Sequence, residues 1–269
     1  QKLYLKSRPA KFVAVEKMNS RLNSGRQLTS QKMVALANTM CAWSGTFEPV
    51  LLRAKWRPAN EPRPYVEYGP EHRALQTLVK SAVQPLASLD GRQFLSIGRN
   101  AAVEAALDGW GTIFKFAAEI DIKDFYTSVD IECVRQVVPC EYRIADVVIM
   151  SAEAMWEYPP SWAFGGLSTA VVASTVRGGL PQGSISSSLV GELVVAKILE
   201  AVPSECRVVN YADNFLIKGR TKREVIETLQ TLAAAIRHAF PGRLSTVCTS
   251  GIRRSSDGID WLGYRIKTR

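Results

Sequence analysis

The 269-residue sequence predicts an α+β fold in which an antiparallel sheet is backed by helices. Residues 114–122, FKFAAEIDI, alternate along the chain in the way typical of a strand. Residues 208–219, VVNYADNFLIKG, place a short polar centre between two apolar runs, which is typical of a tight hairpin. Residues 221–240 carry apolar side chains at helical spacing, with Thr221 as the expected N-cap and Glu224 at the capping-box position.

Other segments extend this pattern toward both ends of the chain. Pro and Arg residues make 51–70 extended or looped, because proline fixes the backbone and removes a donor. A glycine-bounded turn at 178–184 leads into a long apolar helix. The last apolar run, 259–266, predicts a short hairpin or strand. Further helices are expected over 17–45, 71–89, 100–111 and 130–138.

The predicted strand 114–122 has two different faces. Phe116, Ile120 and their like-facing neighbours form an apolar side, whereas Glu119 and Asp121 lie on the other. We therefore expect one buried face and one face that carries acids.

The charge balance is basic, with 34 Lys and Arg against 25 Asp and Glu, a net charge of +9 and a pI near 9.4. Residues 1–70 hold 12 basic and 4 acidic residues, so nearly all the excess lies there. This distribution favours a polyanionic partner, although a solvated basic face is the simpler alternative. No apolar run reaches about 18 residues, so no membrane span is expected.

The cysteines and histidines exclude several kinds of site. Five cysteines form no C-x-x-C pair, which favours free thiols over a disulfide framework or a zinc site. His72 and His238 share no motif, which argues against hydrolysis centred on histidine. The first residues lack the apolar segment of a signal peptide. We expect a cytoplasmic protein.

Two acids occupy positions that an antiparallel sheet can bring together. Asp121 ends the predicted strand, and Asp213 lies at the tip of the predicted hairpin. Two carboxylates at such a site suit a pair of divalent cations, and Mg²⁺ prefers oxygen ligands. The alternative is that both are ordinary turn residues, where aspartate is common. The turn at 178–184 adds Gln182 on a glycine-rich backbone that a ligand can approach closely, although a plain loop before a helix would look similar.

Three motifs in order resemble a known family. DIKDFYTSVD, GLPQGSISSS and YADN are similar to motifs A, B and C of reverse transcriptases, nearest to the bacterial group II intron, retron and defence-associated types. RPYVEYGPEHRALQTLVKSAVQPL with FLSIGRNAAVEAAL resembles the preceding fingers motifs, and WLGYRI resembles the primer grip. The likeness covers about residues 55–269. It implies right-hand polymerase fingers and palm, with little or no thumb. The expected domains are 1–112, a basic extension and fingers, and 113–269, a palm in which 131–177 belong partly to the fingers.

The resemblance also implies roles for particular residues. Tyr126 matches the bulky residue that blocks a ribonucleotide 2′-hydroxyl, and the neighbouring Phe125 is expected to pack inward. The implied metal ligands are Asp121, the Ile122 carbonyl, Asp213 and Asn214, with Asp121 and Asp213 catalytic. The implied nucleotide-binding residues are Arg63, Arg73, Asp124, Phe125, Tyr126, Gln182 and Gly183, with Lys55 and Arg57 as further candidates. The implied primer-side residues are Tyr211, Leu262, Gly263 and Tyr264.

The sequence also departs from the family pattern. Asn214 stands where relatives place a second carboxylate, which keeps an oxygen ligand but gives up a negative charge. We expect weaker Mg²⁺ binding, with Mn²⁺ as an alternative, and an Asn214→Asp variant of equal or higher activity at limiting Mg²⁺. No lysine matches the proposed general acid of motif D. Since little or no thumb is expected, a protein or RNA partner, another domain or the basic N-terminus would hold the duplex.

The function that follows is an RNA-directed DNA polymerase. It would add dNTPs to the 3′-hydroxyl of a DNA or RNA primer on an RNA template, using Mg²⁺ or Mn²⁺. One alternative is a catalytically inactive palm that binds RNA or a protein partner. Another keeps catalysis but changes the reaction to RNA synthesis or to untemplated or protein-primed addition.

Overall fold

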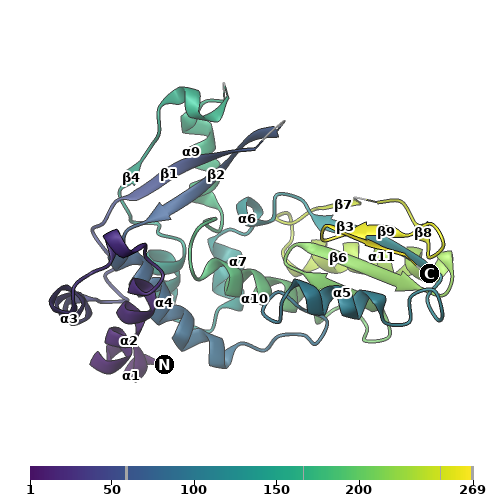
Figure 1. Ribbon diagram of the computed structural model, residues 1–269, viewed down its shortest axis with the longest axis horizontal. Helices are drawn as coiled ribbons and strands as arrows, with labels where there is room; N and C mark the ends of the chain where they lie inside the picture. Colours follow the sequence, from purple (N-terminus) through teal and green to yellow (C-terminus); the bar gives the residue numbers. More distant parts are fainter. Residues whose placement is uncertain (58–59, 166, 249, 268–269) are drawn as a thin grey trace. The chain divides into compact units, whose positions relative to one another are not determined.

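The chain folds into two compact units, each with its own sheet and core (Figure 1). The structure, a computed structural model, describes residues 1–57, 60–165, 167–248 and 250–267. The first unit contains 1–87 and 129–190, and the second contains 88–128 and 191–269. Residues 88–112, expected with the fingers, thus group with the strands of the expected palm. Among the described residues, no helix is long and apolar enough to cross a membrane.

The N-terminal part of the first unit is helical. It contains α1 (Lys2–Lys6), α2 (Arg8–Asn19), α3 (Ser30–Thr39) and α4 (Pro70–Val83), and α2 packs on both α3 and α4. The continuous helix expected over 17–45 is wrong. Asn, Ser and Gly in LNSGR interrupt it with a 3-10 turn, η1 (Ser24–Arg26), because these residues favour turns. The Thr29 side chain then caps α3 by accepting a hydrogen bond from the Lys32 N–H, 3.4 Å away.

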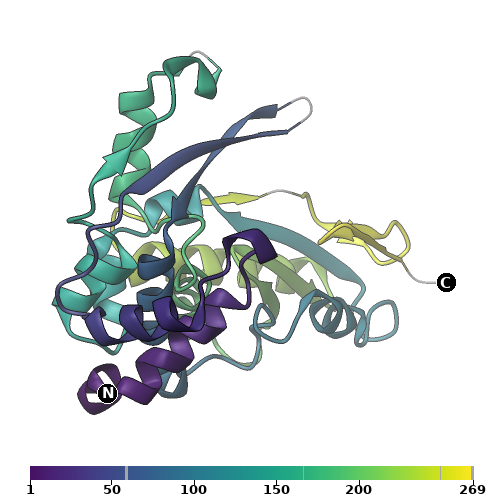
Figure 2. The same cartoon turned by 60° about the vertical axis from the view of Figure 1, so that its left-hand side comes forward.

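The extended segment predicted over 51–70 is a long hairpin (Figure 2). It consists of β1 (Val50–Arg57) and β2 (Asn60–Tyr68), which pair antiparallel. The short strand β4 (Trp156–Glu157) adds to β1 in parallel. Alternate residues of the hairpin enter a core with residues of the next helices: Val50, Leu52, Val66, Tyr68, Ala163, Phe164, Ala173 and Val176.

Short helices complete the first unit. Asp130 caps the predicted helix, its side chain accepting hydrogen bonds from the Glu132 and Cys133 N–H groups at 3.1 Å. His72 is buried, and burial lowers its pKa to about 4, in line with a structural histidine. The remaining elements are η2 (Gln84–Leu86), α7 (Ile131–Val137), α8 (Tyr142–Ile144), η3 (Ala145–Ile149), η4 (Ser161–Phe164) and α9 (Thr169–Gly178); α10 (Ser187–Leu199) begins here and ends in the second unit.

The second unit is built on the predicted antiparallel sheet. Its strand order is β5-β6-β3-β7, and β8 also pairs with β3. Helix α11 packs on β3 and β6, whereas α5 packs on β5 and on the hairpin β9–β10 (Figure 1). The strands are β3 (Phe116–Ile122), β5 (Arg207–Tyr211), β6 (Asn214–Gly219), β7 (Thr246–Cys248), β8 (Arg253–Arg254), β9 (Ile259–Trp261) and β10 (Tyr264–Ile266); the helices are α5 (Arg99–Leu107), α6 (Phe125–Ser128) and α11 (Lys222–Ala239).

Both faces of β3 take part in packing. Ile120 and Ile122 are buried on the apolar face, as expected. The acid-bearing face is not open along its length, because Ala117 is fully buried in a core cluster that α5 shares with the sheet. Only the end of this face, at Glu119 and Asp121, is half-buried. The acids therefore lie at the edge of a core.

Thr221 is confirmed as the N-cap of α11, whereas the reciprocal bond of Glu224 goes to the amide of the residue before the N-cap and not to that of Thr221 itself. The Thr221 hydroxyl accepts a hydrogen bond from the Glu224 N–H at 3.2 Å, and the Glu224 carboxylate accepts one from the Arg220 N–H at 2.8 Å.

A Thr221→Ala variant should lower the free energy of unfolding by about 1 kcal/mol, since one amide at the start of α11 loses its acceptor. Urea denaturation followed by circular dichroism measures the change. The matched control is Thr231→Ala inside the same helix, where the hydroxyl only donates to the Glu227 carbonyl. An equal loss in both variants would contradict the capping role.

Candidate active site

The register of β3 and β6 brings the two predicted acids to one end of the sheet. Asp121 lies opposite Asn214, and Asp213 directly precedes Asn214 in the turn. The Ile122 N–H donates a hydrogen bond to the Asp213 carbonyl at 3.1 Å, which ties the end of β3 to the turn. Carboxylates about 90 residues apart in sequence are thus held close together, one at the end of β3 and one in the turn that leads into the neighbouring β6.

The turn that carries Asp213 is strained and locally supported. Tyr211 pairs with Asn214, so Ala212 and Asp213 form a two-residue turn. Ala212 has φ +57°, which is unfavourable for a residue with a Cβ. The buried Asn210 amide donates to the Ala212 carbonyl at 2.9 Å and to the Asn214 carbonyl at 3.1 Å. Asn210 was not predicted as a site residue from the sequence; the signal that pointed to it was a polar residue ending the apolar run before the turn.

The electrostatics of this end of the sheet suit a cation. The Asp121 Oδ1 atom is buried and has no hydrogen-bond partner among the described residues. Burial, and next the charges of Asp213 and Glu119, raise the pKa of Asp121 to about 6. A divalent cation would relieve both the orphaned oxygen and the repulsion between the carboxylates.

The protein ligands for such a cation are few. In the described part of the chain, no group of three or more His, Cys, Asp or Glu side chains is placed to hold a metal. Two carboxylates are sufficient where substrate phosphates complete the coordination of Mg²⁺. Asp121 and Asp213 therefore fit a metal that binds together with a phosphorylated substrate.

Asn214 has partners that the sequence did not predict. Its amide nitrogen donates to the Glu119 carboxylate, and its amide oxygen accepts from the Trp261 indole N–H. One side chain thus joins β6 to β3 and to β9. Glu119 was visible as a like-facing neighbour of Asp121, whereas nothing in the local sequence pointed to Trp261. The amide gives this end of the sheet a donor that an aspartate would lack.

The residues after β3 take different positions. Phe125 is 3% exposed, and its ring lies 3.1 Å from where a Cβ on Gly191 would be. Its expected inward packing is confirmed, so its ring supports the site from behind and is not exposed to a nucleotide. The ring of the half-buried Tyr126 packs edge-on against it at 5.5 Å between centroids. Asp124 is exposed, with φ +48°.

The primer-side candidates gather around α5. Leu262 and Gly263, both at positive φ, form the turn between β9 and β10. Tyr211 and Leu262 pack against the core cluster that α5 shares with the sheet. The Tyr264 hydroxyl donates to Asn100 at 3.1 Å, and the Arg99 guanidinium lies 5.2 Å from the Tyr264 ring. This helix therefore fixes the hairpin.

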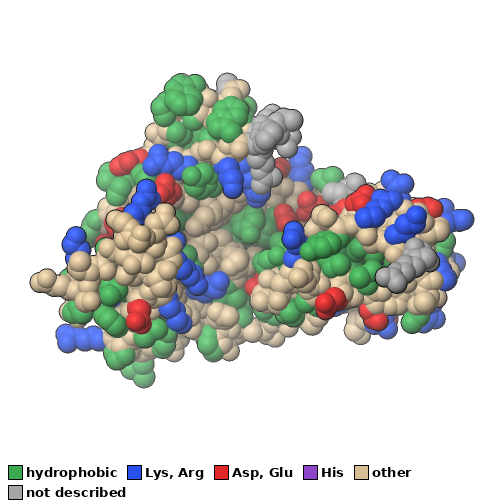
Figure 3. Space-filling model, viewed as in Figure 1, with side chains coloured by type: hydrophobic (Ala, Val, Ile, Leu, Met, Phe, Trp, Pro, Cys, Tyr) green, Lys and Arg blue, Asp and Glu red, His purple; other side chains and the backbone are tan. Residues whose placement is uncertain are grey.

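Three of the nucleotide-binding candidates meet in the first unit. The Arg63 guanidinium donates to the Gln182 side-chain oxygen at 2.7 Å, and the Val66 N–H donates to the Gln182 carbonyl at 2.6 Å. Gly183 has φ +113°, and a Cβ there would lie 2.0 Å from the Val66 carbonyl oxygen, so glycine is required. Arg63, Gln182 and Gly183 line a cavity of the first unit that has a volume of about 600 Å³. Its lining residues are Ala54, Lys55, Arg63, Tyr65, Gln182 and Gly183. In Figure 3, Lys and Arg side chains lie over the hairpin formed by β1 and β2.

Arg73 does not line the cavity that contains Arg63 and Gln182. It lies on α4 and lines a separate cavity of the first unit together with Arg26 and Glu67. The side chain of Arg57 lies outside the described residues. Arg63 and Lys55 are thus the cations that the structure places beside Gln182.

A comparison with protein families decides the identity of the fold. Residues 55–266 match the family model described as reverse transcriptase (RNA-dependent DNA polymerase). The chain belongs to the reverse transcriptase family. The match runs from β1 to β10 and includes the turns that carry Gln182 and Asp213. Membership implies RNA-dependent DNA polymerase activity on a nucleic-acid template and primer with dNTPs, and reverse transcriptases typically use Mg²⁺. No curated protein matches the chain.

An Asp121→Asn variant should raise the melting temperature of the metal-free protein at pH 7.5. The pKa of Asp121 is raised, so the folded state binds its proton more tightly than the unfolded state does, and stability is lost as pH rises toward 6. For this half-exposed group, the gain is roughly 1 kcal/mol, or about 2–4 °C.

Differential scanning fluorimetry in a chelator measures this shift. The gain should shrink as the pH falls below 6 and vanish below the ordinary aspartate pKa of 3.8, where Asp121 is protonated in the folded and unfolded states alike, and the exposed control Glu205→Gln should show no gain. A lower melting temperature at pH 7.5 would contradict the assigned repulsion.

An Asn214→Asp variant should be less stable than the native protein without metal, because a carboxylate would face Glu119 in place of an amide donor. The expected loss is about 1–2 kcal/mol. In Asn214→Asp/Glu119→Gln the amide moves to the partner, so most of the loss should be recovered. Chemical denaturation of the three proteins in a chelator tests this. Equal stability of the single and double variants would show that Glu119 is not the partner that matters.

Proposed function

We propose that the protein is an active RNA-directed DNA polymerase that adds deoxynucleotides to a primer 3′-hydroxyl on an RNA template. The single observation that carries the proposal is the pair Asp121, at the end of β3, and Asp213, in the turn before β6, in which a buried oxygen of Asp121 has no hydrogen-bond partner within the described part of the chain. The large majority of buried side-chain polar atoms have a hydrogen-bond partner, and a carboxylate oxygen without one is more costly to bury than a neutral atom. In the reaction the 3′-hydroxyl oxygen bonds to the α-phosphorus, and pyrophosphate leaves.

In this proposal Asp121 and Asp213 hold the metal. Bound Mg²⁺ would lower the pKa of the attacking hydroxyl and neutralise charge on the leaving pyrophosphate. The half-buried position of the carboxylates strengthens their interaction with a cation, since fewer water molecules screen it. The Ile122 carbonyl and the Asn214 oxygen remain candidates, with the latter already accepting from Trp261.

The first unit would bind the nucleotide. Arg63 and Lys55 provide positive charge for triphosphate oxygens, and a guanidinium suits two oxygens at once. The hydrogen bond from Arg63 to Gln182 orients the guanidinium group, so its position is partly fixed before a ligand binds. The backbone at Gly183 allows close approach of a base or sugar.

Selection of deoxynucleotides is assigned to Tyr126. Its ring is supported from behind by the buried Phe125, which limits its movement. A ring fixed in this way would exclude a 2′-hydroxyl by contact. Tyr211, Leu262, Gly263 and Tyr264 would contact the primer, and Asp124 the incoming nucleotide. The bacterial subgroup, be it group II intron, retron or defence-associated, is part of the same proposal and rests on the motifs alone.

A second candidate is an inactive palm that binds RNA or a partner protein. The observation that favours it is the full engagement of the Asn214 amide by Glu119 and Trp261, where relatives have a second acid. Binding with no incorporation would distinguish it from the polymerase.

The deciding experiment is primer extension. Native protein, given an annealed RNA template and DNA primer with labelled dNTPs and Mg²⁺ or Mn²⁺, should extend the primer, whereas Asp213→Asn should lose at least about a thousandfold in rate. Asp257→Asn, an exposed acid on the same unit, is the matched control and should retain activity. Thermal melting confirms that each variant is folded.

Further arms separate the alternatives. Omitting the template tests untemplated addition, and replacing dNTPs with NTPs tests RNA synthesis. Full activity of Asp213→Asn would refute the site. RNA binding by native protein without extension under any of these conditions would establish the inactive module.

A further inference from the structure

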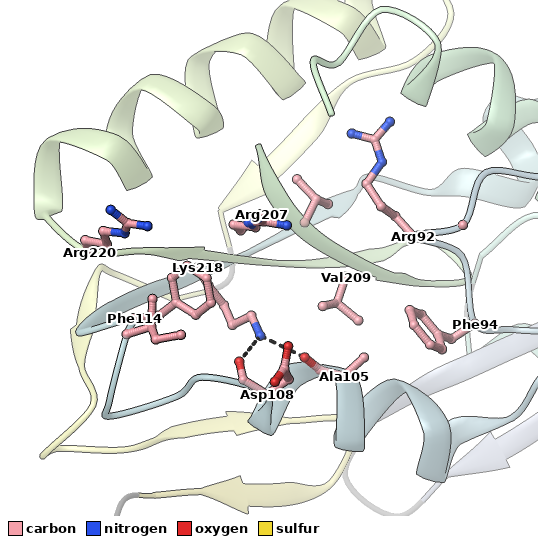
Figure 4. Close-up of a pocket in the computed structure, with 12 residues that line it drawn as sticks. Arg92, Phe94, Ala105, Asp108, Phe114, Arg207, Val209, Lys218 and Arg220 are labelled. Atoms are coloured by element: carbon pink, nitrogen blue, oxygen red, sulfur yellow. Dashed lines mark hydrogen bonds between the residues drawn. The ribbon is translucent and has the colours of Figure 1, made fainter. Parts of the chain in front are cut away.

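The second unit contains a cavity of about 460 Å³ with an unusual concentration of positive charge. It lies between α5 and the ends of β5 and β6 that are remote from the paired carboxylates (Figure 4). Four cations line it, against one acid, Asp108: Arg92, Arg207, Lys218 and Arg220. These four cations differ in whether hydrogen bonds or ion pairs within the protein already engage them.

Two of the four cations are committed to the fold. Lys218 is buried, with 6% of the residue exposed, and its ammonium donates to the backbone carbonyls of Ala105 and Asp108 at 2.7 Å, at the C-terminal end of α5 (Figure 4). Arg92 pairs with Asp90 and donates to the carbonyls of Leu199, Val202 and Pro203. A ligand could bind either side chain only by replacing hydrogen bonds that already hold the fold together.

The other two cations are not committed. The side chains of Arg207 and Arg220 are exposed and form no hydrogen bond or ion pair with any described residue. Arg207 lies directly opposite Lys218 in the β5–β6 register, and Arg220 is two residues beyond Lys218. Like charges opposite one another destabilise a sheet, and the pKa of Lys218 is lowered by burial first and then by the charge of Arg207. After Asp90 offsets Arg92 and Asp108 offsets Lys218, two positive charges remain.

The walls of the cavity are apolar and partly aromatic. Phe94, Ile113, Phe114 and Val209 line it, with Phe94 directed toward the space between Arg92 and Ala105 (Figure 4). A volume of about 460 Å³ lies within the range of small-molecule sites. Apolar walls with guanidinium groups at the opening suit a ligand that has a flat, weakly polar part and a phosphate.

We propose that this cavity is a second ligand site, which binds the phosphate of a nucleotide through Arg207 and Arg220. It is separate from the paired carboxylates, because three residues of β6 lie between Asn214 and Lys218, which places these two positions about 13 Å apart along the strand. The nucleotide is either free or the 5′-phosphorylated end of a strand, since both present the same phosphomonoester.

Isothermal titration calorimetry in a chelator tests the site, because removing divalent cations silences metal-dependent binding elsewhere. The probes are adenosine 5′-monophosphate, adenosine, and a short RNA with either a 5′-phosphate or a 5′-hydroxyl. The phosphate-bearing probe should bind native protein at least about tenfold tighter than its unphosphorylated counterpart, in the nucleoside pair, the RNA pair or both. Which pair discriminates identifies the source of the phosphate.

The Arg207→Ala/Arg220→Ala variant should weaken that binding by about tenfold or more. Its matched control is Arg223→Ala/Arg237→Ala on α11, which removes the same charge outside the cavity and should leave binding unchanged. Equal losses in both variants would mean general charge attraction and would overturn the proposal. Binding that does not depend on a phosphate, or no binding of any probe, would also overturn it. Melting curves of both variants establish that they are folded.

Discussion

The pairing register of β3 with β6 is the constraint on which the rest of the second unit depends. It places Asp121 opposite Asn214 and, through the Ile122–Asp213 hydrogen bond, fixes the turn beside it. A slip of one residue would move every side chain of a strand to the other face, carrying Asp121 into the core and Ile122 out of it. Burial of Ile120 and Ile122 therefore also determines where the carboxylates lie.

Unfavourable local features concentrate where function is proposed. Three of the described non-glycine residues with positive φ, namely Asp124, Ala212 and Leu262, lie in the motifs that resemble catalytic or primer-side segments. The mutual repulsion of the carboxylates adds to this cost. Such features persist only where surrounding contacts support them, and here Asn210 holds the turn. The strained backbone and the repulsion between carboxylates thus make this end of the sheet less stable than its packing would make it without them, as is common at functional sites.

Helix α5 links features that are distant in the sequence. Its C-terminal carbonyls accept from Lys218 of β6, and its first turn holds Tyr264 of the β9–β10 hairpin. Between these contacts Ala102 and Ala106 pack into the core cluster. Because small side chains face the sheet, the helix can lie close to it. One short helix thereby fixes the β9–β10 hairpin and forms a wall of the cavity that Arg207 and Arg220 line.

The sequence by itself determined the α+β class, most elements of the second unit, the N-cap of α11 and the candidate carboxylates, because these depend on local periodicity and on turn chemistry. The prediction of one helix over 17–45 was wrong, because the helical spacing of the apolar residues was given more weight than the turn-forming residues Asn23, Ser24 and Gly25. Only the tertiary structure decided the partners of Asn214, the separation of Arg73 from Arg63 and the unsatisfied charges of Arg207 and Arg220. These depend on which side chains meet across strands and helices, and neither composition nor spacing encodes such long-range contacts.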